Sequence, residues 1–143
     1  MFSGSVYGDD FQEGWNAYKN NDYKKAYKLW LPLAEQGNVT AQYNLGQMYE
    51  KGKGVPQDYK EAVRLYRLSA EQEHASAQHN LGAMYDNGQG ILQDYALAHM
   101  WFNLCGSQRY KQCLRKKNNL EKKMSPTQIE KAQEMARNWK PKK

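Results

Sequence analysis

The sequence has few of the residues and patterns that mark enzymes and metalloproteins. It contains two cysteines and three histidines in 143 residues. No two histidines are four apart, the spacing with which a helix presents two metal ligands. No Gly-rich phosphate loop follows a strand pattern, and no serine has a histidine and a carboxylate in an arrangement typical of a hydrolase. We therefore expect no catalytic residue, no metal site and no cofactor, and predict that the chain is not an enzyme.

Long apolar runs are also missing. No stretch approaches the roughly 20 residues that span a bilayer. The first residues lack the basic start and apolar segment of a signal peptide. We expect residues 1–9 to be a flexible lead, with a chain from which a signal peptide has been removed as an equal alternative.

Acidic residues are scarce at the C-terminal end. Residues 105–143 contain 12 Lys or Arg and three Glu, which gives a net charge of +9. Residues 1–104 contain nine Lys or Arg and 12 Asp or Glu, which gives a net charge of −3. This asymmetry suggests an acidic partner or an anionic surface near that end, but a solvated basic cap that keeps the end of the solenoid soluble is the favoured interpretation. The lysines are spread around a helix rather than along one stripe, and no nucleic-acid-binding fold is recognisable, so nucleic acid is disfavoured as a partner.

What the sequence does contain is an internal repeat of 36 residues. Residues 41–49 and 77–85 agree at seven of nine positions, and the match continues through the pairs Gly52/Gly88 and Asp58/Asp94. Apolar residues within each copy recur at helical spacing. Repeats of this length form solenoids of stacked helical hairpins.

Capping signals predict where the helices begin and end. A glycine can end the first helix of each copy, and Asp58 with Glu61 forms a potential capping box for the next helix. Gly82 lies inside a helix, where glycine costs about 1 kcal/mol against alanine, and is expected to let a second helix approach closely. An earlier, shorter copy begins with a helix near Phe11, and Ser125 followed by proline starts the last helix. We expect eight helices, no strands, and a single domain over residues 10–143, with repeats at about 10–38, 39–74 and 75–110 and a cap at 111–140.

The repeated residues resemble the Sel-one-like repeat, a relative of the tetratricopeptide repeat. The shared pattern is A-x-x-x-L-G-x-x-Y-x-x-G-x-G-V-x-x-D-x-x-x-A, which residues 41–70 and 77–106 follow closely and residues 22–37 follow in its second half. Residues 99–104, 124–129 and 136–141 resemble a recurrent ending of bacterial members. The resemblance implies an all-α, right-handed α-solenoid of about four helix-turn-helix hairpins with a divergent C-terminal capping hairpin. It also implies an adaptor or recognition scaffold, often exported.

Cys105 and Cys113 occupy positions where other copies have small residues, on either side of a turn between hairpins. A disulfide is geometrically reasonable there, with two buried free thiols as the alternative. This pair resembles the cysteine pairs of a family of cysteine-rich bacterial repeat proteins. In that family the two cysteines have the same separation across the same turn, but each lies one position later in the repeat. We favour the disulfide, and hence a periplasmic or secreted protein over a cytoplasmic one.

The resemblance to tetratricopeptide solenoids implies that the first helix of each hairpin lines a concave face. Positions outside the packing stripe differ between copies, as recognition requires, although each could also be ordinary solvent-exposed surface. We expect these positions to form a groove that runs from polar to basic and binds an acidic peptide or protein surface. The candidate residues are Tyr43, Gln47, Glu50, His79, Ala83, Asp86, Arg115, Asn119 and Lys122.

The function predicted from the sequence is a non-enzymatic scaffold or adaptor in the bacterial envelope, with a monomer favoured. One alternative is an immunity protein that neutralises a toxin by very tight one-to-one binding. The other is a hydrolase acting on cell-wall or lactam substrates. The hydrolase would require convergent titratable groups in a pocket, which the sequence does not show.

Overall fold

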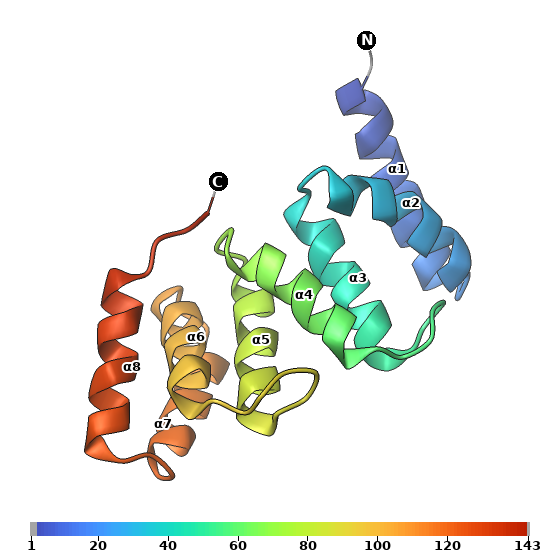
Figure 1. The fold of residues 1–143 in the computed structure, drawn as a ribbon. Helices are drawn as coiled ribbons and strands as arrows, with labels where there is room; N and C mark the ends of the chain where they lie inside the picture. The colour runs from blue at the N-terminus through green and yellow to red at the C-terminus, as the bar shows by residue number, and fades with distance from the viewer. Residues whose placement is uncertain (1–2, 143) are drawn as a thin grey trace. The chain divides into compact units, whose positions relative to one another are not determined.

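The computed structural model describes residues 3–142, with side chains from Asp9 onward (Figure 1). Eight helices and no strand are present in that range, which confirms the predicted all-α fold of helical hairpins. The helices are α1 (Ser3–Lys19), α2 (Tyr23–Glu35), α3 (Val39–Lys51), α4 (Tyr59–Ala70), α5 (Ala75–Asn87), α6 (Tyr95–Ser107), α7 (Lys111–Glu121) and α8 (Pro126–Asn138).

The first helix is longer than the sequence pattern predicts. α1 begins at Ser3, not near Phe11, so the flexible lead expected over residues 1–9 is helical from Ser3. Residues 1–2 lie outside the described part of the chain. Two glycines lower the helix propensity of this segment, but glycine, unlike proline, keeps its backbone N–H and does not break the helix.

The chain divides into two compact units between Leu65 and Tyr66, inside α4. We call them the N-terminal unit and the C-terminal unit. Repeats of a solenoid contact only their neighbours, so such a division does not by itself separate domains. The single domain and the repeat boundaries therefore stay predictions.

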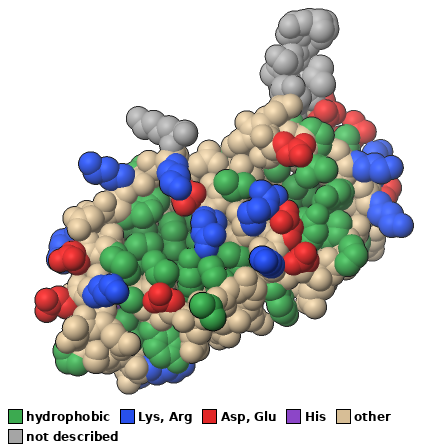
Figure 2. Space-filling view, in the orientation of Figure 1, with side chains coloured by type: hydrophobic (Ala, Val, Ile, Leu, Met, Phe, Trp, Pro, Cys, Tyr) green, Lys and Arg blue, Asp and Glu red, His purple; other side chains and the backbone are tan. Residues whose placement is uncertain are grey.

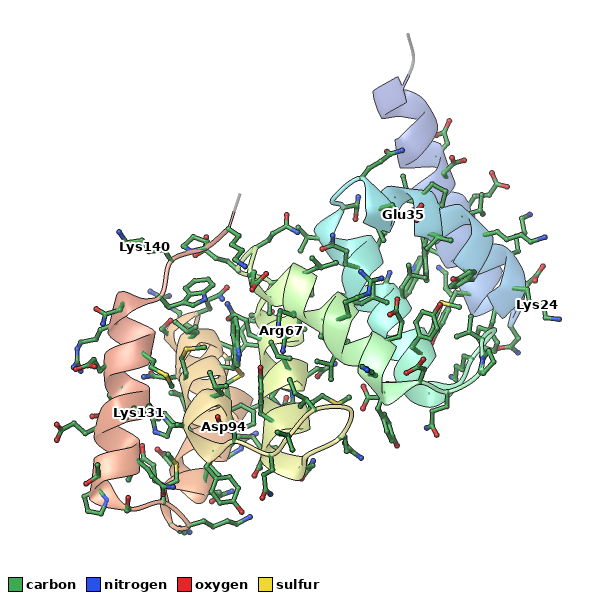
Figure 3. All side chains as sticks on the ribbon, viewed as in Figure 1. Lys24, Glu35, Arg67, Asp94, Lys131 and Lys140 are labelled. Atoms are coloured by element: carbon green, nitrogen blue, oxygen red, sulfur yellow. A yellow bond between two sulfur atoms is a disulfide. The ribbon has the colours of Figure 1, made fainter. Side chains whose placement is uncertain are left out.

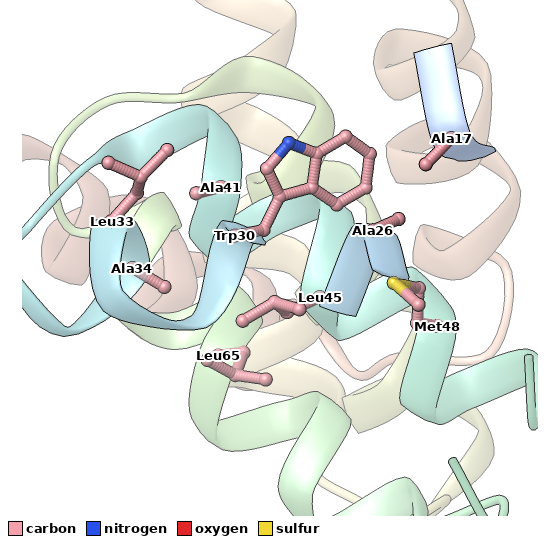
Figure 4. Packing of buried hydrophobic residues seen from close by; sticks show 9 residues of the cluster. All are labelled: Ala17, Ala26, Trp30, Leu33, Ala34, Ala41, Leu45, Met48 and Leu65. Atoms are coloured by element: carbon pink, nitrogen blue, oxygen red, sulfur yellow. The ribbon is translucent and has the colours of Figure 1, made fainter. Parts of the chain in front are cut away.

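The N-terminal unit is built around Trp30 of α2. Its indole is fully buried among small residues, which include Ala26 of α2 itself and Ala17 and Ala41 of the neighbouring helices α1 and α3 (Figure 4). Gly14 of α1 lies directly against the ring, because a Cβ at this position would come within 2.8 Å of the indole Cδ1. The pairing of Gly14 with Trp30 therefore both buries a large aromatic ring and lets α1 approach α2 closely.

In the C-terminal unit, α6 packs against α5, α7 and α8. The ring of Phe102 on α6 is fully buried and lies against Gly82 of α5, where a Cβ would come within 2.8 Å of Cε1. This confirms the expectation that Gly82 allows the second helix of its hairpin to approach. Trp101 makes an edge-on contact with Trp139 beyond α8, with ring centroids 5.8 Å apart.

The glycine helix ends are as predicted, whereas one capping box is not. Gly52 and Gly88 end α3 and α5 in the left-handed conformation, with φ of 68° and 67°. Asp58 accepts the backbone N–H of Glu61 at 3.1 Å, but the Glu61 carboxylate binds the Arg64 guanidinium instead of completing a capping box. The N–H that Glu61 would have accepted, that of Asp58, donates to the Tyr49 carbonyl oxygen at 2.9 Å.

Candidate interaction surface

The helix glycines show which positions on the first helices are equivalent. Gly14 lies against Trp30 and Gly82 against Phe102, and these two rings are 72 residues apart, or two repeats. Gly14 therefore corresponds to Gly46 and Gly82, although it precedes Gly46 by only 32 residues. The first hairpin lacks the long glycine loop, which accounts for the difference.

Tyr43, Gln47 and Glu50 lie together on α3 in the N-terminal unit, each half-buried. They are spaced by four and three residues, so they share one side of the helix. The carbonyl of Glu50 accepts the side-chain amide of Gln57 at 2.8 Å, which ties the end of α3 to the loop that follows.

His79, Ala83 and Asp86 occupy the same positions on α5 in the C-terminal unit and are also half-buried. The imidazole Nε2 of His79 lies 3.2 Å from the side-chain nitrogen of Gln112 on α7, so this side of α5 adjoins α7. The carbonyl of Asp86 accepts the amide of Gln93 at 2.7 Å, which repeats the contact between Glu50 and Gln57.

Arg115, Asn119 and Lys122 are exposed, in contrast to their half-buried counterparts. The first two lie on α7, whereas Lys122 is the residue that caps its C-terminal end. Further exposed cations accompany them in the C-terminal unit, and Figure 3 marks Lys131 on α8 and Lys140 in the segment after it. Six Lys or Arg of this unit are exposed between residues 111 and 131: Lys111, Arg115, Lys116, Lys122, Lys123 and Lys131.

Comparison with known proteins identifies the repeat. The family model of the Sel1 repeat matches residues 11–38, 39–74 and 75–104, which together make up more than half of the chain. The chain belongs to the Sel1 repeat family. No curated protein matches this sequence.

Two solved structures share the Sel1 repeat fold with this chain. One is c5321, a protective antigen of uropathogenic Escherichia coli with an SLR fold, which is 28% identical over 93% of this chain with a TM-score of 0.88. The other is a Sel1 repeat protein of Oxalobacter formigenes, 32% identical over 77% of this chain with a TM-score of 0.73. This chain spans 29% and 45% of the lengths of those two proteins. Sel1 repeats generally mediate protein–protein interaction and are typically non-catalytic.

The first Sel1 repeat has three equivalent positions that the 36-residue period did not reveal. With Gly14 aligned to Gly46, the counterparts of Tyr43, Gln47 and Glu50 are Phe11, Trp15 and Tyr18 of α1. Aligning the helix glycines, rather than counting 36 residues backward, would have found them. In this repeat all three positions are aromatic.

These aromatic residues form a connected cluster. Trp15 and Tyr18 stack nearly parallel, with an interplanar angle of 5° and ring centroids 5.8 Å apart. Tyr18 meets the edge of Tyr23 at 5.0 Å. The ammonium nitrogen of Lys19 lies 5.9 Å from the centroid of Trp15, and that of Lys53 lies 5.8 Å from Tyr18 and 5.3 Å from Tyr23.

The three histidines have structural contacts. His99 is fully buried, and its Nε2 lies 2.7 Å from a carboxylate oxygen of Glu121. His74 caps α5 by accepting the backbone N–H of Ala77 at its Nδ1, and burial lowers the pKa of its imidazole below 6.5. Among the described residues, no group of three or more His, Cys, Asp or Glu is placed to hold a metal ion.

A disulfide joins Cys105 at the end of α6 to Cys113 on α7, as the sequence predicts, with Cα atoms 5.9 Å apart. Both side chains are fully buried. A structural disulfide is consistent with an oxidising compartment. None of the eight helices in the described part of the chain has the length and hydropathy required to cross a membrane.

One surface pocket of about 230 Å³ lies in the C-terminal unit. It is bordered by the ends of α5 and α6 and by the segment after α8, and Glu73 is its one carboxylate. The lining residues are Glu73, Gln78, Leu104, Ser107, Gln108, Trp139 and Pro141. None of the nine candidate residues lines it, so the pocket and the candidate surface are separate features of this unit.

Proposed function

We propose that this chain is a non-enzymatic scaffold that binds an acidic segment of a partner protein through the first helices of its Sel1 repeats. The observation that carries the proposal is the contrast between two sets of positions on those helices. Packing positions repeat, as in Leu45 and Leu81, which are both fully buried. The adjacent positions change in chemistry from one repeat to the next and are half-buried or exposed, so the core does not dictate their identity.

The charge of the C-terminal unit supports an acidic partner. Six Lys or Arg are exposed between residues 111 and 131, against one exposed carboxylate, that of Glu130. The other carboxylate in this range, that of Glu121, lies 2.7 Å from His99. Clustered exposed cations speed association with acidic surfaces and favour them over basic ones. Figure 2 shows apolar side chains among charged ones on the visible face.

We further propose that the protein acts outside the cytoplasm, in the periplasm or as a secreted protein. The disulfide between Cys105 and Cys113 supports this location, because cytosolic thiols are kept reduced. A monomer is the proposed state.

The test is affinity capture from a bacterial envelope extract at low and raised salt. We expect a stoichiometric protein partner that raised salt releases, because exposed charge pairs are screened. A variant with Tyr43→Ala, His79→Ala and Arg115→Ala should lose capture. As a control, Lys28→Gln with Lys60→Gln removes two positive charges from exposed positions on α2 and α4, and should retain it.

Folding of each variant is checked by circular dichroism. Should the triple variant unfold, Arg115→Gln with Lys122→Gln replaces only exposed side chains and serves in its place. Capture that survives these changes would refute the proposed surface. A partner that binds one-to-one with very slow release, and that is itself a toxin, would identify an immunity protein instead of an adaptor.

A further inference from the structure

The aromatic cluster on α1 has one member, Trp15, that is partly exposed although it contacts the core. Trp30 is fully buried and its indole N–H donates to the Phe11 carbonyl oxygen at 3.2 Å. Trp15 is 39% exposed, although it stacks on Tyr18 and leans against Trp30 at a centroid distance of 6.1 Å. A large aromatic side chain held rigidly at the surface is the residue type that most often dominates protein interfaces.

Two lysines give this aromatic surface a positive charge. Lys19 lies over Trp15, and Lys53, from the loop after α3, lies over both Tyr18 and Tyr23. An ammonium group over a ring face still has N–H donors directed toward solvent. The rings therefore do not attract a further cation, whereas a carboxylate close to the rings would pair with the lysines.

We propose that Trp15, Tyr18, Lys19 and Lys53 form a docking site for an aromatic side chain flanked by carboxylates in a segment of a partner protein. The incoming ring packs on the exposed part of Trp15, and the carboxylates pair with the two ammonium groups. The proposal rests on the proposed function, namely binding of an acidic protein segment by the first helices. It assigns to the N-terminal unit an anchor that recognises one type of side chain.

Single-stranded nucleic acid also combines flat rings with negative charge, but the charge of the N-terminal unit favours protein. Residues 1–65 contain eight Lys or Arg and eight Asp or Glu, and so have no net charge. Nucleic-acid binding requires cations along the phosphate backbone. Here α1 itself carries Asp9, Asp10 and Glu13, and Glu13 already pairs with Lys25 at 3.6 Å. Two lysines suit a short segment with one or two carboxylates.

The test uses labelled synthetic peptides and the full chain. The probe is Gly-Ser-Glu-Phe-Glu-Ser-Gly, compared with versions in which alanine replaces phenylalanine or glutamine replaces both glutamates. We expect fluorescence anisotropy to show at least tenfold tighter binding of the first peptide than of either altered version. In nitrogen-15 NMR spectra the indole N–H signal of Trp15 should shift, and that of the buried Trp30 should not.

Variants then locate the binding. Trp15→Ala should weaken binding of the phenylalanine peptide about tenfold or more, and Lys53→Gln about threefold. Lys28→Gln removes an exposed lysine of α2 and should leave affinity unchanged. Lys53→Gln removes no side chain from the core, so it decides the question even if Trp15→Ala destabilises the protein.

The outcomes separate this inference from the proposed function. Equal binding of the alanine and phenylalanine peptides, or loss of binding only on Arg115→Gln, overturns the docking site while leaving the scaffold in place. Binding of an oligothymidylate with the same dependence on Trp15 and Lys53, without binding of the peptide, overturns it in favour of nucleic acid. If no peptide binds and no envelope partner is captured, both proposals fail.

Discussion

A single added methyl group tests whether the helix glycines hold the hairpins together. In Gly82→Ala, the new Cβ would lie 2.8 Å from Cε1 and 2.9 Å from Cδ1 of Phe102. Phe102 is fully buried, and its ring also contacts His79 at a centroid distance of 5.9 Å, so it cannot simply rotate away. Either the ring or the helix must move.

The magnitude follows from two opposing effects. Overpacking of a well-filled core costs about 1–3 kcal/mol, whereas alanine in place of glycine within a helix gains about 1 kcal/mol. We expect Gly82→Ala to lower the free energy of unfolding by about 1 kcal/mol. Gly106→Ala is the matched control, because its Cβ would meet mainly the end of the Leu114 side chain, which is 38% exposed and can turn outward. That variant should be neutral or stabilised by up to about 1 kcal/mol.

Urea unfolding followed by circular dichroism measures both variants. Equal slopes with shifted midpoints would show that stability alone changed. A double variant with Phe102→Leu adds a direct test, since a smaller side chain relieves the clash and should make the double variant more stable than the sum of the single effects predicts. The reasoning is refuted if Gly82→Ala is as stable as Gly106→Ala, or if the two effects are additive.

Three further predictions concern the turns between hairpins. Reduction of the bond between Cys105 and Cys113, which closes a short loop, should lower the free energy of unfolding by about 2–3 kcal/mol; urea midpoints that coincide with and without dithiothreitol would contradict this. Glu73 has a φ of 70°, so Glu73→Gly should raise stability by about 0.5–1 kcal/mol while Glu73→Ala should not, as compared by thermal unfolding. The pKa of His74 is lowered below 6.5 by burial, so the unfolded chain binds its proton more readily, and stability should fall as the pH drops below 6.5. His74→Asn keeps the cap, as Asn38 does at the equivalent turn, and should remove that part of the decline in melting temperature between pH 7.5 and 5.5; an unchanged decline would show that His74 is not its source.

Much of the fold is predictable because local signals and the repeat agree. The left-handed glycine ends of α3 and α5 recur one period apart, and Ser125 begins α8 with a full capping box. The period also locates a strained turn. Gly37, Glu73 and Arg109 are 36 residues apart and all have positive φ. Their N–H groups donate to the carbonyl oxygens of Ala34, Ala70 and Gly106, so the repeated turn imposes a conformation that only glycine adopts easily.

The predictions from the sequence were wrong or incomplete where two partners compete for one side chain and where the repeat period changes. The Glu61 carboxylate had two possible partners. The capping-box pattern predicts the backbone N–H of Asp58, but Arg64, three residues on, offers a charged and bidentate partner. The aromatic residues of α1 were missed because the first hairpin is four residues shorter between its helices. A strict 36-residue period therefore places position 47 against Phe11, not against Trp15.

Repeats differ at the strained turn between hairpins and at an open position on the first helices. Only the first kind of difference carries a cost in folding free energy. Glu73 and Arg109 replace glycine at a strained turn, where the change carries an energetic cost and gives no new contact surface. The series Trp15, Gln47, Ala83 and Asn119 varies at a position that the core leaves open. At such a position a polar residue is the default, and three of the four members are small or polar. The tryptophan is the departure, because the other copies have small or polar side chains at this position and Trp15 leaves 39% of its surface exposed. Contacts with Tyr18 and Trp30 account for the buried part of Trp15, and the proposed docking site gives a role to the exposed part.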